Sequence, residues 1–80
     1  MDVLVRYFAA AADAAGREEE SLHFAPNATL GDLRSLLEKR YTGMTDVLRN
    51  GSFLIDKVVR RSLDMPLAPR VDVLPPFAGG

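Results

Sequence analysis

One segment of this chain, residues 29–41, has the spacing of an amphipathic helix. Its apolar side chains recur at three- and four-residue intervals, which places them on one face: Leu30, Leu33, Leu37 and Tyr41. Thr29 precedes the pattern as an N-cap, and Asp32 three positions later completes a sequence similar to a capping box. A leucine stripe of this kind is usually a core face, so we expect the helix to cover a sheet formed by the rest of the chain.

Short alternating segments on both sides of this helix predict strands. Residues 2–8 place Val3, Val5 and Tyr7 on one apolar face, which we expect to point into the core. The remaining predicted strands are residues 21–25, 52–55, 58–61 and 70–74. If the last strand returns beside the first, Leu4, Phe8 and Leu74 share the outer face of the sheet next to Phe77, where an apolar patch would mark an interaction surface.

The other segments are expected to be short helices, loops and turns. The alanine-rich residues 9–15 predict a short helix that stops at Gly16, and residues 41–51 predict a loop or a single helical turn. The order of elements predicts an α+β fold in which one main helix covers the sheet. We expect a single domain over residues 1–75, followed by a protruding C-terminal tail at residues 76–80.

Composition narrows the function classes. The chain has 80 residues, no cysteine and a net charge of −1, which indicates one small core without disulfides and no broad surface for nucleic acid or anionic membranes. No apolar run approaches the length of a membrane span, and no signal-peptide pattern precedes the first strand. We therefore expect a cytoplasmic protein that binds neither nucleic acid nor membrane.

The side chains offer little catalytic chemistry. His23 is the only histidine and stands on the polar face of its predicted strand, so a surface position is favoured over a metal or catalytic role. The run Glu18–Glu20 is expected to be a solvated face. Arg60, Arg61 and Arg70 predict a small basic area of solvated residues rather than a nucleic-acid site. We predict no catalytic residues, no metal site and no bound cofactor.

The C-terminal residues 74–80, Leu-Pro-Pro-Phe-Ala-Gly-Gly, carry the one unusual chemical group. Pro75 and Pro76 cannot donate the hydrogen bonds of a sheet, so the last strand should end there. Gly79 and Gly80 remove side chains next to the α-carboxylate that we expect at Gly80, which leaves a segment thin enough to enter a narrow site. A carboxylate is inert until it is activated, and ATP-dependent adenylation by another enzyme would make it reactive. A frayed end or a linker is the alternative interpretation of such a segment.

Several segments together resemble the small sulfur-carrier proteins, the family that includes the small subunit of molybdopterin synthase and the thiamin-pathway carrier. They are the strand Val-Leu-Val-Arg-Tyr-Phe-Ala at residues 3–9, Gly16, the helix start Thr-Leu-Gly-Asp-Leu at residues 29–33, and residues 74–80. The resemblance covers nearly the whole chain, and the Pro-Pro-aromatic-x-Gly-Gly ending is its most specific part. It implies a ubiquitin-like β-grasp fold with a flexible Gly-Gly tail.

The resemblance also implies roles for individual residues. Gly80 would be adenylated by an enzyme of the ubiquitin-activating type, which uses ATP, and would then be converted to a thiocarboxylate. The protein would be a non-catalytic sulfur-donor subunit that inserts its tail into the large subunit of molybdopterin synthase. The residues that would contact these partners are Phe8, Leu74, Pro75, Pro76, Phe77, Ala78 and Gly79.

Three alternatives remain open at this point. The sulfur could go to thiamin or cysteine synthesis instead of molybdopterin. The protein could instead be a ubiquitin-like modifier that is conjugated to lysines, or a plain interaction domain. Likeness of fold alone does not separate these functions.

Overall fold

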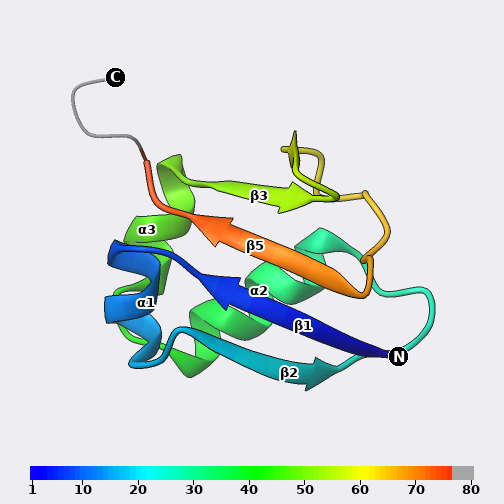
Figure 1. The fold of residues 1–80 in the computed structure, drawn as a ribbon, viewed down its shortest axis with the longest axis horizontal. Coiled ribbons are helices and arrows are strands. Elements are labelled where there is room, and N and C mark those ends of the chain that lie inside the picture. Colours follow the sequence, from blue (N-terminus) through cyan, green and yellow to red (C-terminus); the bar gives the residue numbers. More distant parts are fainter. Residues whose placement is uncertain (77–80) are drawn as a thin grey trace.

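The computed structural model describes residues 1–76 and shows a sheet with the main helix packed across one face (Figure 1). In chain order its elements are β1 (Asp2–Tyr7), α1 (Ala10–Ala15), β2 (Glu19–His23), α2 (Leu30–Arg40), α3 (Met44–Asn50), β3 (Ser52–Ile55), β4 (Val58–Arg60) and β5 (Arg70–Leu74). This is the predicted α+β class. Across residues 1–76, no helix has the length and apolar character needed to cross a membrane.

The five strands within residues 1–76 form one mixed sheet in the order β2-β1-β5-β3-β4. The first and last strands are parallel neighbours in its centre, with Val5 opposite Val71 and Tyr7 opposite Val73. The other pairs, β1 with β2, β3 with β5 and β3 with β4, are antiparallel. The return of β5 beside β1, on which the expected outer-face arrangement depended, is therefore confirmed.

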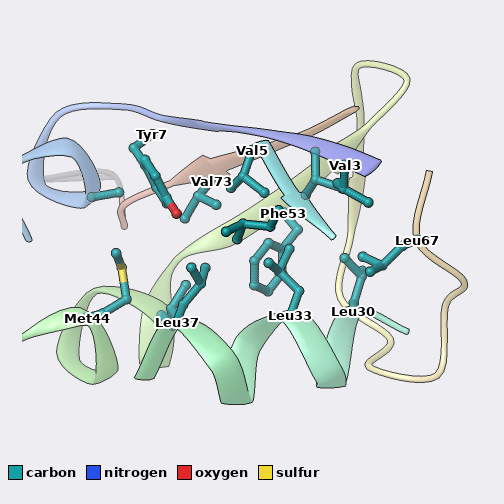
Figure 2. Packing of buried hydrophobic residues seen from close by; sticks show 14 of the residues in the cluster. Val3, Val5, Tyr7, Leu30, Leu33, Leu37, Met44, Phe53, Leu67 and Val73 are labelled. Carbon is teal, nitrogen blue, oxygen red and sulfur yellow. The ribbon is translucent and has the colours of Figure 1, made fainter. Parts of the chain in front are cut away.

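The core lies between the sheet and α2, where side chains from the two layers meet (Figure 2). Val3 and Val5 from β1, and Leu30, Leu33 and Leu37 from α2, are all fully buried. The predicted inner face of the first strand and the leucine stripe are thus confirmed. At such positions a leucine-to-alanine change costs about 2 to 5 kcal/mol, which makes this contact the main support of the fold.

The start of α2 has the expected capping box. The Asp32 backbone N–H donates to the Thr29 hydroxyl at 3.4 Å, and the Thr29 backbone N–H donates to the Asp32 carboxylate at 2.9 Å. The shorter Asp in place of the usual Glu or Gln therefore still closes the reciprocal pair. This cap fixes where α2 begins under the sheet.

Two segments differ from the sequence-based expectation. Residues 41–51 predict a loop or a single turn, but the structure has the helix α3, in which Met44 and Leu48 are buried one turn apart. The periodic signal is short because α3 has only seven residues, in which the partly buried Val47 packs against the core beside these two buried positions. The second strand is β2 (Glu19–His23) rather than residues 21–25, and this shift brings Glu20 into the sheet.

Candidate functional site

The chain leaves β5 beside the end of β1. The backbone N–H of Phe8 donates to the carbonyl oxygen of Val73 at 3.1 Å, so the parallel ladder continues one residue past β1 and places Phe8 next to Leu74. Both side chains are half-buried on the face of the sheet opposite the helices. Pro75 is half-buried and Pro76 is exposed. The structure therefore brings together four of the predicted site residues where the last strand ends.

Phe8 is held in place by a cationic neighbour. The guanidinium carbon of Arg6 lies 5.3 Å from the centroid of the Phe8 ring, within the range of a cation–π contact. A cavity of about 300 Å³ opens beside them, between the end of β1, the start of α1 and the acidic residues Glu18 and Glu19. An aromatic ring next to a recess is a suitable contact point for a partner.

The predicted apolar patch is not continuous. Leu4 shares the outer face with Phe8 and Leu74, but in register it stands opposite Arg70. Between Leu4 and Phe8, the same face carries Arg6 opposite Asp72, and Asp72 is only 8% exposed. A polar row thus divides the face, and only Phe8 and Leu74 lie beside the departing chain.

The structure separates the three arginines that the sequence groups together. Arg70 lies on the outer face, where its Nε is 3.4 Å from the Asp72 carboxylate. Arg60 and Arg61 instead line a different cavity, which they share with Arg34 and Arg49. The predicted grouping of Arg60, Arg61 and Arg70 is therefore wrong, because β3 separates β4 from β5 and Arg60 and Arg70 lie on opposite faces of the sheet.

His23 is exposed, as expected for a surface residue. Its Nδ1 lies 2.9 Å from Oδ1 of Asp2, and both side chains are more than 70% exposed. The hydrogen bond and the charge of His23 lower the pKa of Asp2. Such an exposed pair contributes little to stability.

The expectation of a solvated Glu18–Glu20 run is wrong at Glu20. Tyr7 donates a hydrogen bond to Oε2 of Glu20 at 2.6 Å, and Tyr41 donates to the same oxygen. The Glu20 side chain is only 7% exposed. No spacing in the sequence signals this cluster, because its members come from β1, β2 and the end of α2. It joins the β1–β2 edge of the sheet to the helix and so supports the strand that carries Phe8.

The remaining predicted site residues, Phe77, Ala78, Gly79 and Gly80, lie outside the described residues. Their roles stay predictions, as does the division into a domain at 1–75 and a tail at 76–80. What the structure supplies is the point of departure at Leu74 and Pro75, and the side chains around it.

The sheet order, the helix packed on one face and the parallel pairing of the first and last strands define a ubiquitin-like β-grasp protein. A family model described as ThiS family matches residues 5–80, and the chain belongs to this family. The match runs through both terminal glycines.

Solved structures show the same fold. A putative molybdopterin converting factor, subunit 1, from Pyrococcus furiosus is 25% identical, with 96% of this chain and 99% of that chain covered and a TM-score of 0.81. A chain from the complex of subunits 1 and 2 of the Helicobacter pylori molybdopterin-converting factor is 26% identical, with both chains fully covered and a TM-score of 0.72. The H. volcanii small archaeal modifier protein 1 is 17% identical over 95% of this chain and 98% of its own, with a TM-score of 0.74. The comparison with curated proteins returned no match.

Proposed function

We propose that this protein is a sulfur carrier whose working group is the C-terminal carboxylate of Gly80. The observation that carries the proposal is the family match, which extends through Gly79 and Gly80. The geometry is consistent with it, because β5 ends at Leu74 on the rim of the domain and the chain continues outward through an exposed Pro76.

The proposed chemistry has two steps. A carboxylate oxygen of Gly80 attacks the α-phosphorus of ATP, which releases pyrophosphate and leaves an acyl adenylate. A sulfur nucleophile such as hydrosulfide then attacks the acyl carbon and AMP departs, which leaves a thiocarboxylate. Both steps need a partner of the ubiquitin-activating type, and this chain would contribute only the substrate group. Because the activation consumes ATP, we propose that the protein acts in the cytoplasm.

We further propose molybdopterin synthesis as the destination of the sulfur, with this chain as the small subunit of molybdopterin synthase. Two similar structures are described as molybdopterin converting factor subunits, and one of them is a complex with subunit 2. A large-subunit partner is in keeping with that complex, and we propose that this partner encloses the C-terminal residues. Phe8, Leu74, Pro75 and Pro76 would form the part of the contact that belongs to the folded domain, and residues 77–79 would enter the partner.

Intact-mass measurement tests the proposal. The chain ending at Gly80 is incubated with ATP, sulfide and a candidate activating enzyme, and we expect a mass gain equal to one exchange of oxygen for sulfur. Deleting Gly80, or changing Gly79→Trp, should abolish the gain while the thermal unfolding transition stays at the wild-type temperature, because a terminus adds little to the core. An unchanged wild-type mass would overturn the carrier function.

The same assay distinguishes the second candidate function, conjugation to lysines, from sulfur carriage. The fold is shared with a small archaeal modifier protein and does not separate the two functions, so lysine conjugation is the alternative. Adducts in which the C-terminus is joined to protein lysines would favour a modifier. Binding of the thiocarboxylate form to a molybdopterin synthase large subunit, and turnover with it, would favour the molybdopterin branch over thiamin or cysteine synthesis.

A further inference from the structure

Four arginines line one cavity of about 260 Å³ at the β3–β4 end of the fold. Arg34 comes from α2, Arg49 from α3, and Arg60 and Arg61 from the end of β4 and the residue after it. The cavity lies on the helix side of the sheet, since Arg60 stands opposite the core residue Phe53. Four of the ten basic side chains of a chain with net charge −1 thus gather in one place.

The charges in this arginine cavity are poorly neutralised. Among the described residues that line it there is no carboxylate. Arg34 pairs with Glu38 at 2.9 Å, but the pair of Arg49 with Asp46 is long, at 3.6 Å, and both of its side chains are mostly exposed. Within residues 1–76, Arg60 and Arg61 have no carboxylate at ion-pair distance. The cavity therefore concentrates positive potential on a protein that is slightly acidic overall.

The arginine cavity adjoins the point where the chain leaves the domain. Its lining includes Gly51 and Ser52, and Ser52 is the register partner of Leu74. A Cβ at Gly51 would come within 2.4 Å of the Leu74 carbonyl oxygen, so the backbones are in contact. Any protein that takes up the residues after Pro76 must approach this end of the sheet.

Apart from the C-terminal carboxylate that is to react, residues 75–80 carry no charged side chain that could steer such an encounter. The cavity also suits an acidic protein surface better than an enclosed small molecule. Of the three large apolar side chains among its described lining residues, Leu48 and Phe53 are about 95% buried and Leu63 is exposed, so little apolar surface is left for a ring. Guanidinium groups from three elements match carboxylates spread along a surface, with which they form forked hydrogen bonds.

We infer that the arginine cavity is the docking point for an acidic surface of the enzyme that activates the C-terminus. This inference rests on the proposed function and adds the chemistry of the partner. The activating enzyme must capture the free carrier from solution, and charge complementarity acts mainly on the rate of such encounters. The complementary surface should carry several Asp or Glu side chains next to the opening that admits the C-terminus.

A peptide titration tests the cavity without reference to activation. Hexaglutamate added to the ¹⁵N-labelled protein should shift the amides of residues 48–53 and 60–63, and the double variant Arg60→Glu/Arg61→Glu should lose these shifts. The matched control is Lys39→Glu/Lys57→Glu, which makes the same change of charge at two exposed residues outside the cavity. Shifts centred on Arg6 or Arg70 would contradict the assignment. Shifts from tripolyphosphate but none from hexaglutamate would overturn it in favour of a small-anion site.

Loading kinetics test the partner. With limiting activating enzyme, the Arg60→Glu/Arg61→Glu variant should form thiocarboxylate about tenfold more slowly at low salt, with the difference shrinking as salt rises, while the Lys39→Glu/Lys57→Glu control stays near wild type. Equal rates for wild type and the arginine variant, with wild type loading normally, would overturn the inference and leave the proposed function standing. Failure of wild type to load would overturn the proposed function and the assigned partner together, and the titration would still report whether the cavity binds carboxylates.

Discussion

Tyr7 and Tyr41 donate hydrogen bonds to the same carboxylate oxygen of Glu20. Their rings meet edge to face, with centroids 6.2 Å apart and planes 79° apart. The other Glu20 oxygen lies 3.3 Å from Arg17 and 3.7 Å from Arg40. One carboxylate therefore joins β1, β2 and the end of α2, and its oxygens have polar partners although the side chain is nearly buried.

Removing one of the two hydroxyls should weaken the fold measurably. Tyr41→Phe deletes one hydrogen bond to a charged group and should lower the free energy of unfolding by about 1 to 2 kcal/mol in urea denaturation. Arg17→Ala is the control, because Arg17 is half-exposed and a surface ion pair is worth about 0 to 1 kcal/mol. Equal urea midpoints for Tyr41→Phe and wild type would show that water replaces the lost partner at no cost.

The Glu20 carboxylate also predicts how stability depends on acid. Burial acts to raise the pKa of Glu20, but the hydrogen bonds from Tyr41 and Tyr7 and the charges of Arg40 and Arg17 outweigh it and lower this pKa. The unfolded chain therefore takes up a proton at higher pH than the folded protein does. The contribution of Glu20 is complete above the unfolded pKa and is lost as the pH falls through the folded pKa.

Urea midpoints measured from pH 7 down to about pH 3 check this prediction. Wild type should lose stability as the pH falls below about 5, and Glu20→Gln should show a shallower decline over the same range because this group no longer titrates. The variant should also be less stable than wild type at pH 7. Parallel curves for the two proteins would mean that other carboxylates account for the acid response.

Gly51 predicts a second effect on stability, at the end of the sheet where the chain departs. A Cβ there would lie 2.4 Å from the Leu74 carbonyl oxygen and 2.6 Å from that of Val47. Gly51→Ala must push apart backbone atoms of β5 and α3, and we expect a loss of about 2 to 3 kcal/mol. Gly16→Ala is the comparison, because a Cβ at this position meets no atom of residues 1–76 within 4 Å and carries only the strain of a φ of +71°. It should cost about 1 kcal/mol. In thermal unfolding, Gly51→Ala should therefore lose more stability than Gly16→Ala, and the opposite order would contradict the prediction.

The β3–β4 turn predicts a gain in stability. Asp56 and Lys57 form a two-residue connection with φ of 53° and 66°, a backbone that favours Asn-Gly. Replacing the pair by Asn-Gly should remove part of the strain and raise the melting temperature by a few degrees, or about 0.5 to 1 kcal/mol. The reverse order, Gly-Asn, serves as a control with the same composition and should gain less. A lower melting temperature for Asn-Gly would indicate that the present side chains contribute contacts outside the turn.

Sequence reasoning found the parts of this fold that depend on local pattern. Burial follows directly from two patterns, the alternation of Val3, Val5 and Tyr7 and the spacing of Leu30, Leu33 and Leu37. Each pattern lies within one segment, so the buried face can be identified without knowing how distant segments pack. The two strands on either side of Asp56 and Lys57 also follow from local pattern, although these two residues are poor examples of the turn type that joins them. The same reasoning places Phe8 and Leu74 on one face, since alternation within two adjacent strands is sufficient for that.

The features that the sequence did not predict depend on residues far apart in the chain. The sequence predicts that Glu20 is part of a solvated run. In the fold, the sheet and the end of the main helix bring Tyr7 and Tyr41 to the Glu20 carboxylate, to which both donate hydrogen bonds. Arg60 and Arg61 have no spacing that connects them to Arg34 or Arg49, and only the packing of α2, α3 and β4 makes them one cavity. The net charge of the chain does not indicate this cavity either, because it sums charges that the fold places on different faces.

Phe8 and Leu4 offer a matched test of the candidate site. Both stand on the outer face of β1 or directly after it and both are half-buried, but only Phe8 lies next to Leu74 and the departing chain. Phe8→Ala should leave the fold intact and weaken binding of the large subunit or the activating enzyme by about 10- to 30-fold, the effect of truncating an aromatic anchor worth about 1.4 to 2 kcal/mol. Leu4→Ala should change binding by less than about threefold, since its neighbour in register is Arg70. Equal losses of binding affinity for the two variants would indicate that the interface covers the whole outer face. An unchanged affinity for Phe8→Ala would indicate that the partner contacts only residues beyond Leu74. Melting temperatures of both variants, measured in parallel, separate weakened binding from a weakened fold.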